Sequence, residues 1–264
     1  MSYYKIDKLE DWLYRFYDPM SVNCYLVIGE EKALLLDTGY GIVPLMPEIE
    51  KLTTLPITVV LSHGHVDHVN GAFDFDEAWM HEADLDVLKE HTAKEWRKDL
   101  AEEAIGNGVK GVDPIAHANK KCPDIKSLQI GQIFDLGGLN CEIIAMPGHS
   151  AGSVGLLIKE GCVLISADGA SHLIWLFLHE STSVKAYADM LEKVYQLDFD
   201  YFLTGHTDVK NPKSDFEKLI SVARNATFEK GKPYDQLPEL EGYIYAEDDT
   251  AIVFSKRTIG YEEK

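Results

Sequence analysis

The segment His63-Gly64-His65-Val66-Asp67-His68 constrains this chain more than any other feature, because it places three imidazoles and one carboxylate in six positions. It directly follows the apolar run PITVVL, residues 56–61, which is typical of a buried strand. A strand that ends in a loop can aim several side chains at one point, whereas a long helix would spread them around its circumference. Imidazole and carboxylate together suit Zn²⁺, and also Fe or Mn. The segment therefore predicts a metal site at the end of a strand.

Three isolated polar residues further along the chain repeat this pattern. His149, Asp168 and His206 each come shortly after a run of apolar residues that is typical of a strand. Side chains just past the ends of neighbouring strands meet at one rim of a sheet, where functional groups gather. The separations along the chain are too large for a local metal-binding finger. We therefore expect the tertiary fold to bring these residues to the 63–68 segment.

The number of candidate ligands indicates two ions. Five histidines and two carboxylates follow this pattern: His63, His65, Asp67, His68, His149, Asp168 and His206. A catalytic Zn²⁺ needs three protein ligands and a water, so seven donors are too many for one ion and suit two ions if one carboxylate bridges them. We expect two divalent metal ions, zinc in the first place, with iron or manganese as alternatives. The other histidines, His91 among them, are expected in surface or packing roles.

Composition excludes several partners. The 264 residues carry a net charge of −19, and 45% of them are hydrophobic. Such a field repels phosphate backbones and anionic lipid, so we expect a small-molecule substrate, no nucleic acid and no membrane. The four cysteines form no CxxC pair, the N-terminal segment has no apolar leader, and the longest apolar run is 173–178. These features predict a cytoplasmic protein and leave a homo-oligomer open.

The pattern of apolar residues predicts mixed α/β structure. Strands are expected at 23–28, 33–36, 56–61, 127–134, 139–145, 154–159, 162–166, 199–203 and 251–255. Those at 154–159 and 162–166 are expected to form a hairpin across Glu160-Gly161. One helix is expected at 184–194, capped by Thr182 or Ser183, and another after a capping box at Ser214, running towards Gly231. A charged segment from about 77 to 126 has apolar residues at roughly helical spacing and predicts a helical insertion. Trp175 and Phe177 follow Asp168 and have two candidate roles, lining a substrate pocket or packing in the core as strand residues, and the core role is favoured. No linker divides the chain, so we expect one domain over 1–264.

These motifs resemble the metallo-β-lactamase superfamily. The hallmark HxHxDH of that family is found at 63–68, and its PGH[ST]xGS segment at 147–153. The isolated aspartate after a strand is Asp168, the final GH is Gly205-His206, and the early DTG is Asp37-Thr38-Gly39. The resemblance implies an α/β fold, a four-layer αββα sandwich, with a two-metal site on one rim.

The resemblance also implies a role for each candidate ligand. It assigns them in two groups with one bridge: His63, His65 and His149 for the first metal, Asp67, His68 and His206 for the second, and Asp168 between them. Asp37 would orient a ligating imidazole from behind. The activity implied is a hydrolase that uses a metal-bound hydroxide to cleave a thioester, ester or lactone of a small molecule. Asp67 is the candidate catalytic residue, because it could move a proton to the leaving group.

Differences between this sequence and individual branches of the superfamily narrow the range of expected activities. β-Lactamases of this family with a cysteine ligand carry it where this chain has Asp168, so antibiotic hydrolysis is not expected. The diiron flavoproteins have glutamate at the position of His65, and RNA-processing members need a basic surface. Hydroxyacylglutathione hydrolases and lactonases share the ligand pattern. The former carry a C-terminal helical region with basic residues for glutathione, whereas this chain ends in a strand-like run at 251–255.

Two alternatives come from other classes. Persulfide dioxygenases also resemble this sequence and use a single iron on the residues that correspond to His63, His149 and Asp168. Metal identity and uptake of dioxygen would separate them from a hydrolase. A non-catalytic metal-binding domain is the third option, and it predicts bound metal without turnover of any activated ester.

Overall fold

The structure is a computed structural model that describes residues 3–237 and 239–262, and it divides the chain into two compact units. The first unit comprises Met1–Gln129 and Ile133–Asn140, and the second comprises Ile130–Gln132 and Cys141–Lys264. Each unit combines strands with helices. The expectation of one domain over residues 1–264 is not tested by this division and stays a prediction.

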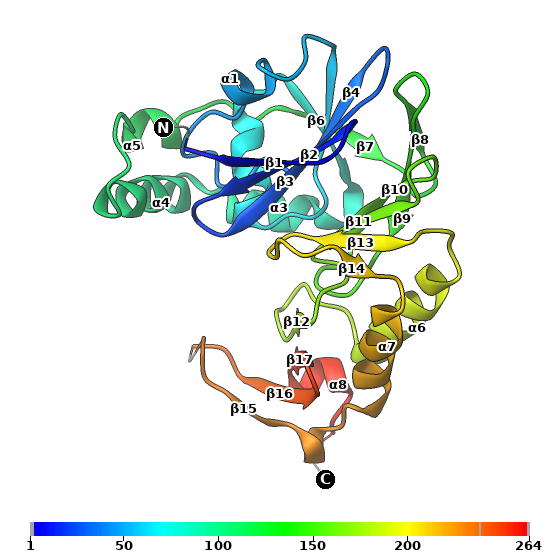
Figure 1. Cartoon of the computed structure of the whole chain (residues 1–264). Helices are drawn as coiled ribbons and strands as arrows, with labels where there is room; N and C mark the ends of the chain where they lie inside the picture. Colours follow the sequence, from blue (N-terminus) through cyan, green and yellow to red (C-terminus); the bar gives the residue numbers. More distant parts are fainter. Residues whose placement is uncertain (1–2, 238, 263–264) are drawn as a thin grey trace. The chain divides into compact units, whose positions relative to one another are not determined.

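The first unit is built on a seven-stranded sheet whose strands follow one another in chain order (Figure 1). The strands are β1 (Lys5–Glu10), β2 (Leu13–Asp18), β3 (Val22–Ile28), β4 (Ala33–Leu36), β5 (Ile57–Val60), β6 (Glu77–His81) and β7 (Asp124–Leu128). The first four form an antiparallel meander, and β4 to β7 pair in parallel. Strands β3, β4 and β5 lie at the predicted positions. A further short strand, β8 (Ile133–Asp135), also falls within this unit.

The helices of the first unit are short apart from one. They are α1 (Met46–Ile49), α2 (Val66–Val69), α3 (Leu85–His91), α4 (Lys94–Gly106) and α5 (Pro114–Ala118), with 3-10 turns η1 (Asn70–Asp74) and η2 (Glu82–Asp84). The expected helical insertion at 77–126 is helical only in its middle, because both of its ends are the strands β6 and β7. Alternation of side chains explains the difference: Ala78 and Met80 of β6 are buried, whereas Trp79 between them is only partly buried. The many charges nearby concealed this short alternation in the sequence.

The second unit contains a mixed sheet, and three candidate ligands, His149, Asp168 and His206, follow the ends of its strands. Its strands run in the order β14 (Asn211–Pro212), β13 (Tyr201–Thr204), β11 (Val163–Ala167), β10 (Val154–Ile158) and β9 (Asn140–Ala145). Strands β10 and β11 form the predicted antiparallel hairpin, whereas β11 and β13 pair in parallel. Parallel neighbours need a crossover, and the predicted amphipathic helix α6 (Val184–Tyr195) lies in that connection.

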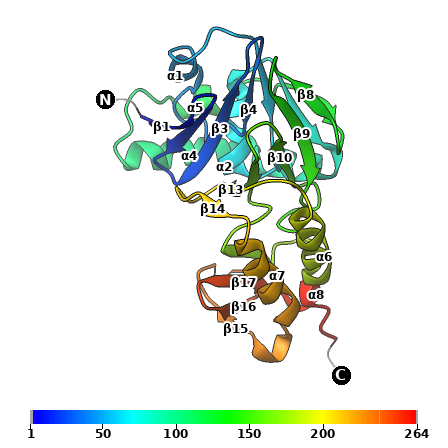
Figure 2. The ribbon, with the colours of Figure 1, turned by 45° about the vertical axis from the view of Figure 1, so that its right-hand side comes forward.

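The two long helices of this unit lie side by side (Figure 2). Ser183 caps α6 by accepting a hydrogen bond from the backbone N–H of Ala186, as predicted. Helix α7 (Asp215–Asn225) ends six residues before Gly231, and the side chain of Ser214 makes no cap hydrogen bond, so the predicted capping box is wrong. Ser214 itself has helical backbone angles, which differ from the extended conformation of a capping residue.

The C-terminal part adds a second sheet to this unit. Its strands run in the order β12 (Leu173–Leu176), β17 (Thr250–Phe254), β16 (Gly242–Glu247) and β15 (Lys232–Tyr234), followed by helix α8 (Lys256–Ile259), with a 3-10 turn η3 (Phe228–Lys230) before β15. Strand β17 is the predicted last strand. Helix α7 contacts β16 and β17, and the residues between them belong to the main core of the unit. Among the described residues, no helix is both long enough and apolar enough to cross a bilayer.

Candidate metal centre

In the first unit, two parallel strands end side by side at the residues of interest. Strand β4 ends at Leu36 and is followed by Asp37, and its neighbour β5 leads to Ser62 and His63. The carboxyl ends of parallel strands are where α/β sheets place functional groups. Asp37 has a positive φ of 63°, a conformation that is uncommon for a residue with a side chain. Such residues persist where the surrounding structure holds them, often at functional sites.

The Asp37 carboxylate organises two imidazoles through hydrogen bonds. Its Oδ2 accepts from Nδ1 of His68 at 2.8 Å and from the hydroxyl of Ser62 at 2.7 Å, while Oδ1 accepts from the backbone N–H of Ser62 at 2.7 Å. Since Ser62 donates to Asp37, its Oγ accepts from Nδ1 of His63 at 3.0 Å. Both imidazoles are therefore assigned the tautomer that carries its proton on Nδ1 and its lone pair on Nε2.

The remaining donors of this unit lie close to these two rings. Nε2 of His63 is 3.1 Å from Nδ1 of His65, and Nε2 of His68 is 3.4 Å from Oδ2 of Asp67. His63, His65 and His68 are buried, whereas Asp67 is partly exposed. His91 of α3 stacks on the His65 ring with centroids 4.6 Å apart. The first unit thus brings together the four residues that were predicted in the 63–68 segment.

Backbone contacts fix the segment that carries His68. The backbone N–H and the hydroxyl of Thr38 both donate to the carbonyl of His68, and the N–H of Gly71 donates to the carbonyl of Gly39. On the other side, the buried Arg97 of α4 donates to Oδ1 of Asn70 at 2.9 Å. These contacts on both sides hold the chain that runs from His68 into η1.

In the second unit, Asp168 and His206 follow two parallel strands, β11 and β13. The pairing of these strands shifts register between Ile165 and Ala167, and Ala167 has a positive φ of 45°. This irregularity is a bulge, which re-aims the residue that follows. Nε2 of His206 lies 3.1 Å from Oδ2 of Asp168. His206 is exposed and Asp168 is partly buried.

His149 is held in a tight loop after β9. Its Nδ1 donates to the carbonyl of Trp175 at 2.8 Å, which assigns the lone pair to Nε2, and Nε2 lies 3.7 Å from Oδ2 of Asp168. The hydroxyl of Ser181 donates to the His149 carbonyl at 2.8 Å. Gly148 is required because a Cβ there would lie 2.4 Å from the ring of Tyr187. The second unit thus brings together His149, Asp168 and His206.

The chemistry of both groups fits divalent metal ions. Three imidazoles are held through Nδ1 by oxygen acceptors, an arrangement that orients histidine ligands in metal sites: His63, His68 and His149. Nitrogen donors with carboxylates suit Zn²⁺, Fe or Mn. The residues present therefore fit the expected cofactor. The ligand roles of all seven residues, the convergence of the two groups on common ions and the catalytic role of Asp67 stay predictions.

Three contributors were missed at the level of sequence. Ser62 adjoins the histidine segment, but a serine gives no signal of its own. His91 was expected in a surface or packing role, yet its ring lies on that of His65. Trp175 contributes its backbone carbonyl, which any residue could supply, so no residue-type pattern could have found it.

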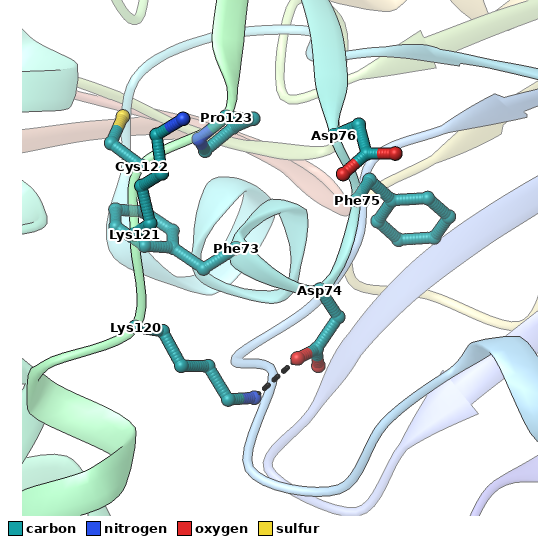
Figure 3. A pocket seen from close by; sticks show the side chains of 8 residues that line it. All are labelled: Phe73, Asp74, Phe75, Asp76, Lys120, Lys121, Cys122 and Pro123. Carbon is teal, nitrogen blue, oxygen red and sulfur yellow. Dashed lines mark hydrogen bonds and ion pairs between the residues drawn. The ribbon is translucent and has the colours of Figure 1, made fainter.

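A separate pocket of the first unit contains none of the candidate ligands (Figure 3). Its lining comprises Phe73, Asp74, Phe75, Asp76, Lys120, Lys121, Cys122 and Pro123. Across it the ammonium group of Lys120 forms an ion pair with Asp74 at 2.5 Å. Asp76 and Lys121 add one further charge of each sign, so the lining carries no net charge.

Comparison with known proteins agrees with the motifs and the fold. The family model of the metallo-beta-lactamase superfamily matches residues 17–206, so the chain belongs to that superfamily. Among solved structures, a metallo-beta-lactamase from Pontibacter korlensis aligns with a TM-score of 0.58 at 16% identity, over 84% of this chain and 100% of that one. The family protein TTHA1429 from Thermus thermophilus aligns with a TM-score of 0.55 at 19% identity, over 81% and 80% of the two chains. The predicted α/β fold of the metallo-β-lactamase type is confirmed.

Three curated relatives are similar in sequence. The human acyl-coenzyme A thioesterase MBLAC2 is 28% identical over 80% of this chain and 81% of its own length. The Haemophilus influenzae hydroxyacylglutathione hydrolase GloC is 32% identical over 55% and 65%, and the probable metallo-hydrolase YqgX of Bacillus subtilis is 25% identical over 57% and 66%. The chain thus spans about two thirds of the latter two. The prediction of a hydrolase from this metal-dependent family is confirmed.

Proposed function

We propose that this protein is a metal-dependent hydrolase of thioesters, with oxygen esters and lactones as the neighbouring substrate classes. The observation that supports it most is the pairing of Asp37 with His68 and, through Ser62, with His63, which presents two Nε2 lone pairs beside His65. The similarity to an acyl-coenzyme A thioesterase extends over 80% of the chain and favours an acylated thiol as the substrate.

In this proposal, the seven predicted ligands hold two divalent ions, which we take to be zinc, in a protein located in the cytoplasm. When bound, such ions lower the pKa of water to about 7 and polarise a carbonyl. The residues of the chain orient the ligating imidazoles and transfer a proton to the leaving group. Asp37 fixes the rings of His63 and His68, and the Trp175 carbonyl fixes His149. The carboxylate of Asp67 would take up the proton that the attacking water releases and pass it to the departing sulfur, which leaves as the thiol.

The experiment combines metal analysis with a substrate panel. Purified protein is analysed for bound metal and assayed with acyl-coenzyme A, acyl-glutathione, an aryl ester and a lactone. We expect thioester hydrolysis that a chelator abolishes and added metal restores. His65→Ala should lose bound metal and hydrolysis together, while His81→Ala, a histidine outside the candidate ligands, should keep both.

Three results would reject the proposal. Full turnover by the His65→Ala variant would show that the reaction does not depend on the metal. Consumption of dioxygen with a persulfide by iron-loaded protein, without thioester hydrolysis, would favour the dioxygenase alternative. Bound metal with no turnover of any substrate would favour the alternative of a non-catalytic metal-binding domain.

A further inference from the structure

The loop of His149 is anchored to the edge of a sheet. Strand β12 is the outermost strand of the C-terminal sheet and pairs only with β17 among its strands. The carbonyl of His172 accepts from the N–H of Ala251 on β17, so by alternation the backbone of Trp175 faces the opposite, open edge. There the Trp175 carbonyl accepts from Nδ1 of His149 at 2.8 Å. The candidate ligand His149 is therefore hydrogen-bonded directly to the backbone of β12.

The two faces of β12 differ in what covers them. Ile174 and Leu176 point to the side of α6 and α7 and belong to the main core, with exposed fractions of 2% and 0%. Leu173 and Trp175 share the other face, where Leu173 is 45% exposed and Trp175 is partly buried. The second face is thus the one that retains accessible apolar surface, and it includes Trp175, whose carbonyl contacts His149.

The aromatic residues on this second face form a rigid wall. The Trp175 ring meets that of Phe177 edge to face at 5.6 Å and that of Tyr234 at 6.3 Å. Phe177, Tyr234 and Val253 form a small core of their own beneath it. The stretch LIWLFL at 173–178 carries no charge and no side-chain carboxylate or amide, so its side chains offer a phosphate or another charged group no partner. An apolar chain is the ligand that fits such a surface.

We propose that Leu173 and Trp175 form the binding site for the acyl chain of the substrate, whose carbonyl carbon is attacked next to His149. This inference rests on the proposed thioesterase function and adds the specificity for the acyl group. Burial of each further methylene of the chain against the wall should improve binding roughly three- to fourfold until the wall is covered. The protein should therefore prefer medium or long acyl chains to acetyl.

The test is a series of acyl thioesters of one thiol, from acetyl to decanoyl, assayed with the metal-loaded protein. We expect kcat/KM to rise with chain length in the wild type. In Trp175→Ala the loss with the decanoyl substrate should exceed the loss with the acetyl substrate at least tenfold, whereas Trp175→Phe should keep most of the preference. Leu173→Ser, a change at an exposed position that leaves the core intact, should also flatten the rise. Trp12→Ala, which removes a partly buried indole of the first unit, should leave it unchanged.

Failure of the inference can be told apart from failure of the function. If thioesters are hydrolysed with no dependence on chain length, or if Trp175→Ala lowers all rates equally, the acyl site is refuted while the function stands. If no thioester is hydrolysed, calorimetric binding of the decanoyl thioether of the same thiol decides. A tenfold weaker affinity in Trp175→Ala supports the site, and equal affinities refute it.

Discussion

The carboxylate of Asp37 and the imidazole of His68 face each other at 2.8 Å, and both side chains are buried. The contact joins the end of β4 to helix α2, thirty-one residues apart in the chain. The same oxygen of Asp37 also accepts the hydroxyl of Ser62, which in turn accepts from His63. A single carboxylate thus sets the tautomer and direction of two imidazoles, as carboxylates do behind histidine ligands of metals.

Removal of this carboxylate should weaken metal binding without removing a ligand. For Asp37→Ala we expect the metal affinity to fall about 10- to 100-fold, because His63 and His68 lose the acceptor that orients them. Competition with a chromophoric chelator measures the affinity. Asp11→Ala, a change at an aspartate whose side chain is 98% exposed, should bind metal like the wild type. Equal affinities of the two variants would show that Asp37 does not orient the ligands.

Two glycines should respond to alanine in opposite directions. A Cβ on Gly71 would lie 2.1 Å from the backbone oxygen of Thr38, the residue that holds the His68 carbonyl, so Gly71→Ala should destabilise the fold by about 2–4 kcal/mol. Gly106 ends α4 with nothing within 4 Å of such a Cβ, so Gly106→Ala should add up to about 1 kcal/mol. Urea unfolding monitored by circular dichroism compares them. A stable Gly71→Ala protein would mean that the close approach is not needed.

The buried guanidinium of Arg97 should contribute strongly to stability. It donates to Asn70 and to the carbonyl of His117, and it lies 3.5 Å above the ring of Phe73. Arg97→Met should cost about 2–4 kcal/mol of unfolding free energy, since Oδ1 of Asn70 and the His117 carbonyl both lose the guanidinium as a donor.

Arg224 provides the matched control on the surface. Its guanidinium pairs with Asp189 and Glu192, and all three side chains are substantially exposed. Arg224→Met should therefore cost less than about 1 kcal/mol. Similar losses in Arg97→Met and Arg224→Met, measured by urea unfolding, would contradict this account of the buried arginine.

Stability should fall as the pH is lowered from about 6.5 to about 4, with a contribution from His117. Burial, together with the positive charges of Arg97 and Lys120, lowers the pKa of His117 to about 4. Below pH 6.5, His117 is protonated in the unfolded chain but stays neutral in the folded protein until the pH reaches about 4. The free energy of unfolding therefore falls by up to about 3 kcal/mol over this range. The loss is absent above pH 6.5 and complete below pH 4.

The measurement is the free energy of unfolding between pH 4 and 7 for the wild type and for His117→Gln. Other groups titrate in both proteins, so the difference between the two curves isolates His117. We expect the wild type to lose more stability than the variant as the pH falls. Parallel curves would place the titration elsewhere.

Local pattern sufficed for much of the fold. The alternation of apolar and turn residues predicted β3, β4, β5 and the hairpin of β10 and β11, and amphipathic spacing predicted α6 with its cap at Ser183. Local pattern failed where the residues next to a short strand have a helical pattern. Strands β6 and β7 are each five residues long and flank a helical, charged segment, and only their parallel pairing with each other and of β6 with β5 makes them strands.

The sequence by itself determined the chemistry of the candidate site, because metal ligation depends on residue type, and three histidines and an aspartate within six residues are informative before any folding. Only the tertiary structure decided how those groups are oriented. The serine between Asp37 and His63, the ring of His91 on His65, and the Trp175 carbonyl that holds His149 are contacts between segments distant in the chain or made by backbone atoms. Backbone groups are the same in every residue, so their roles are set by strand pairing and leave no trace in the order of side chains.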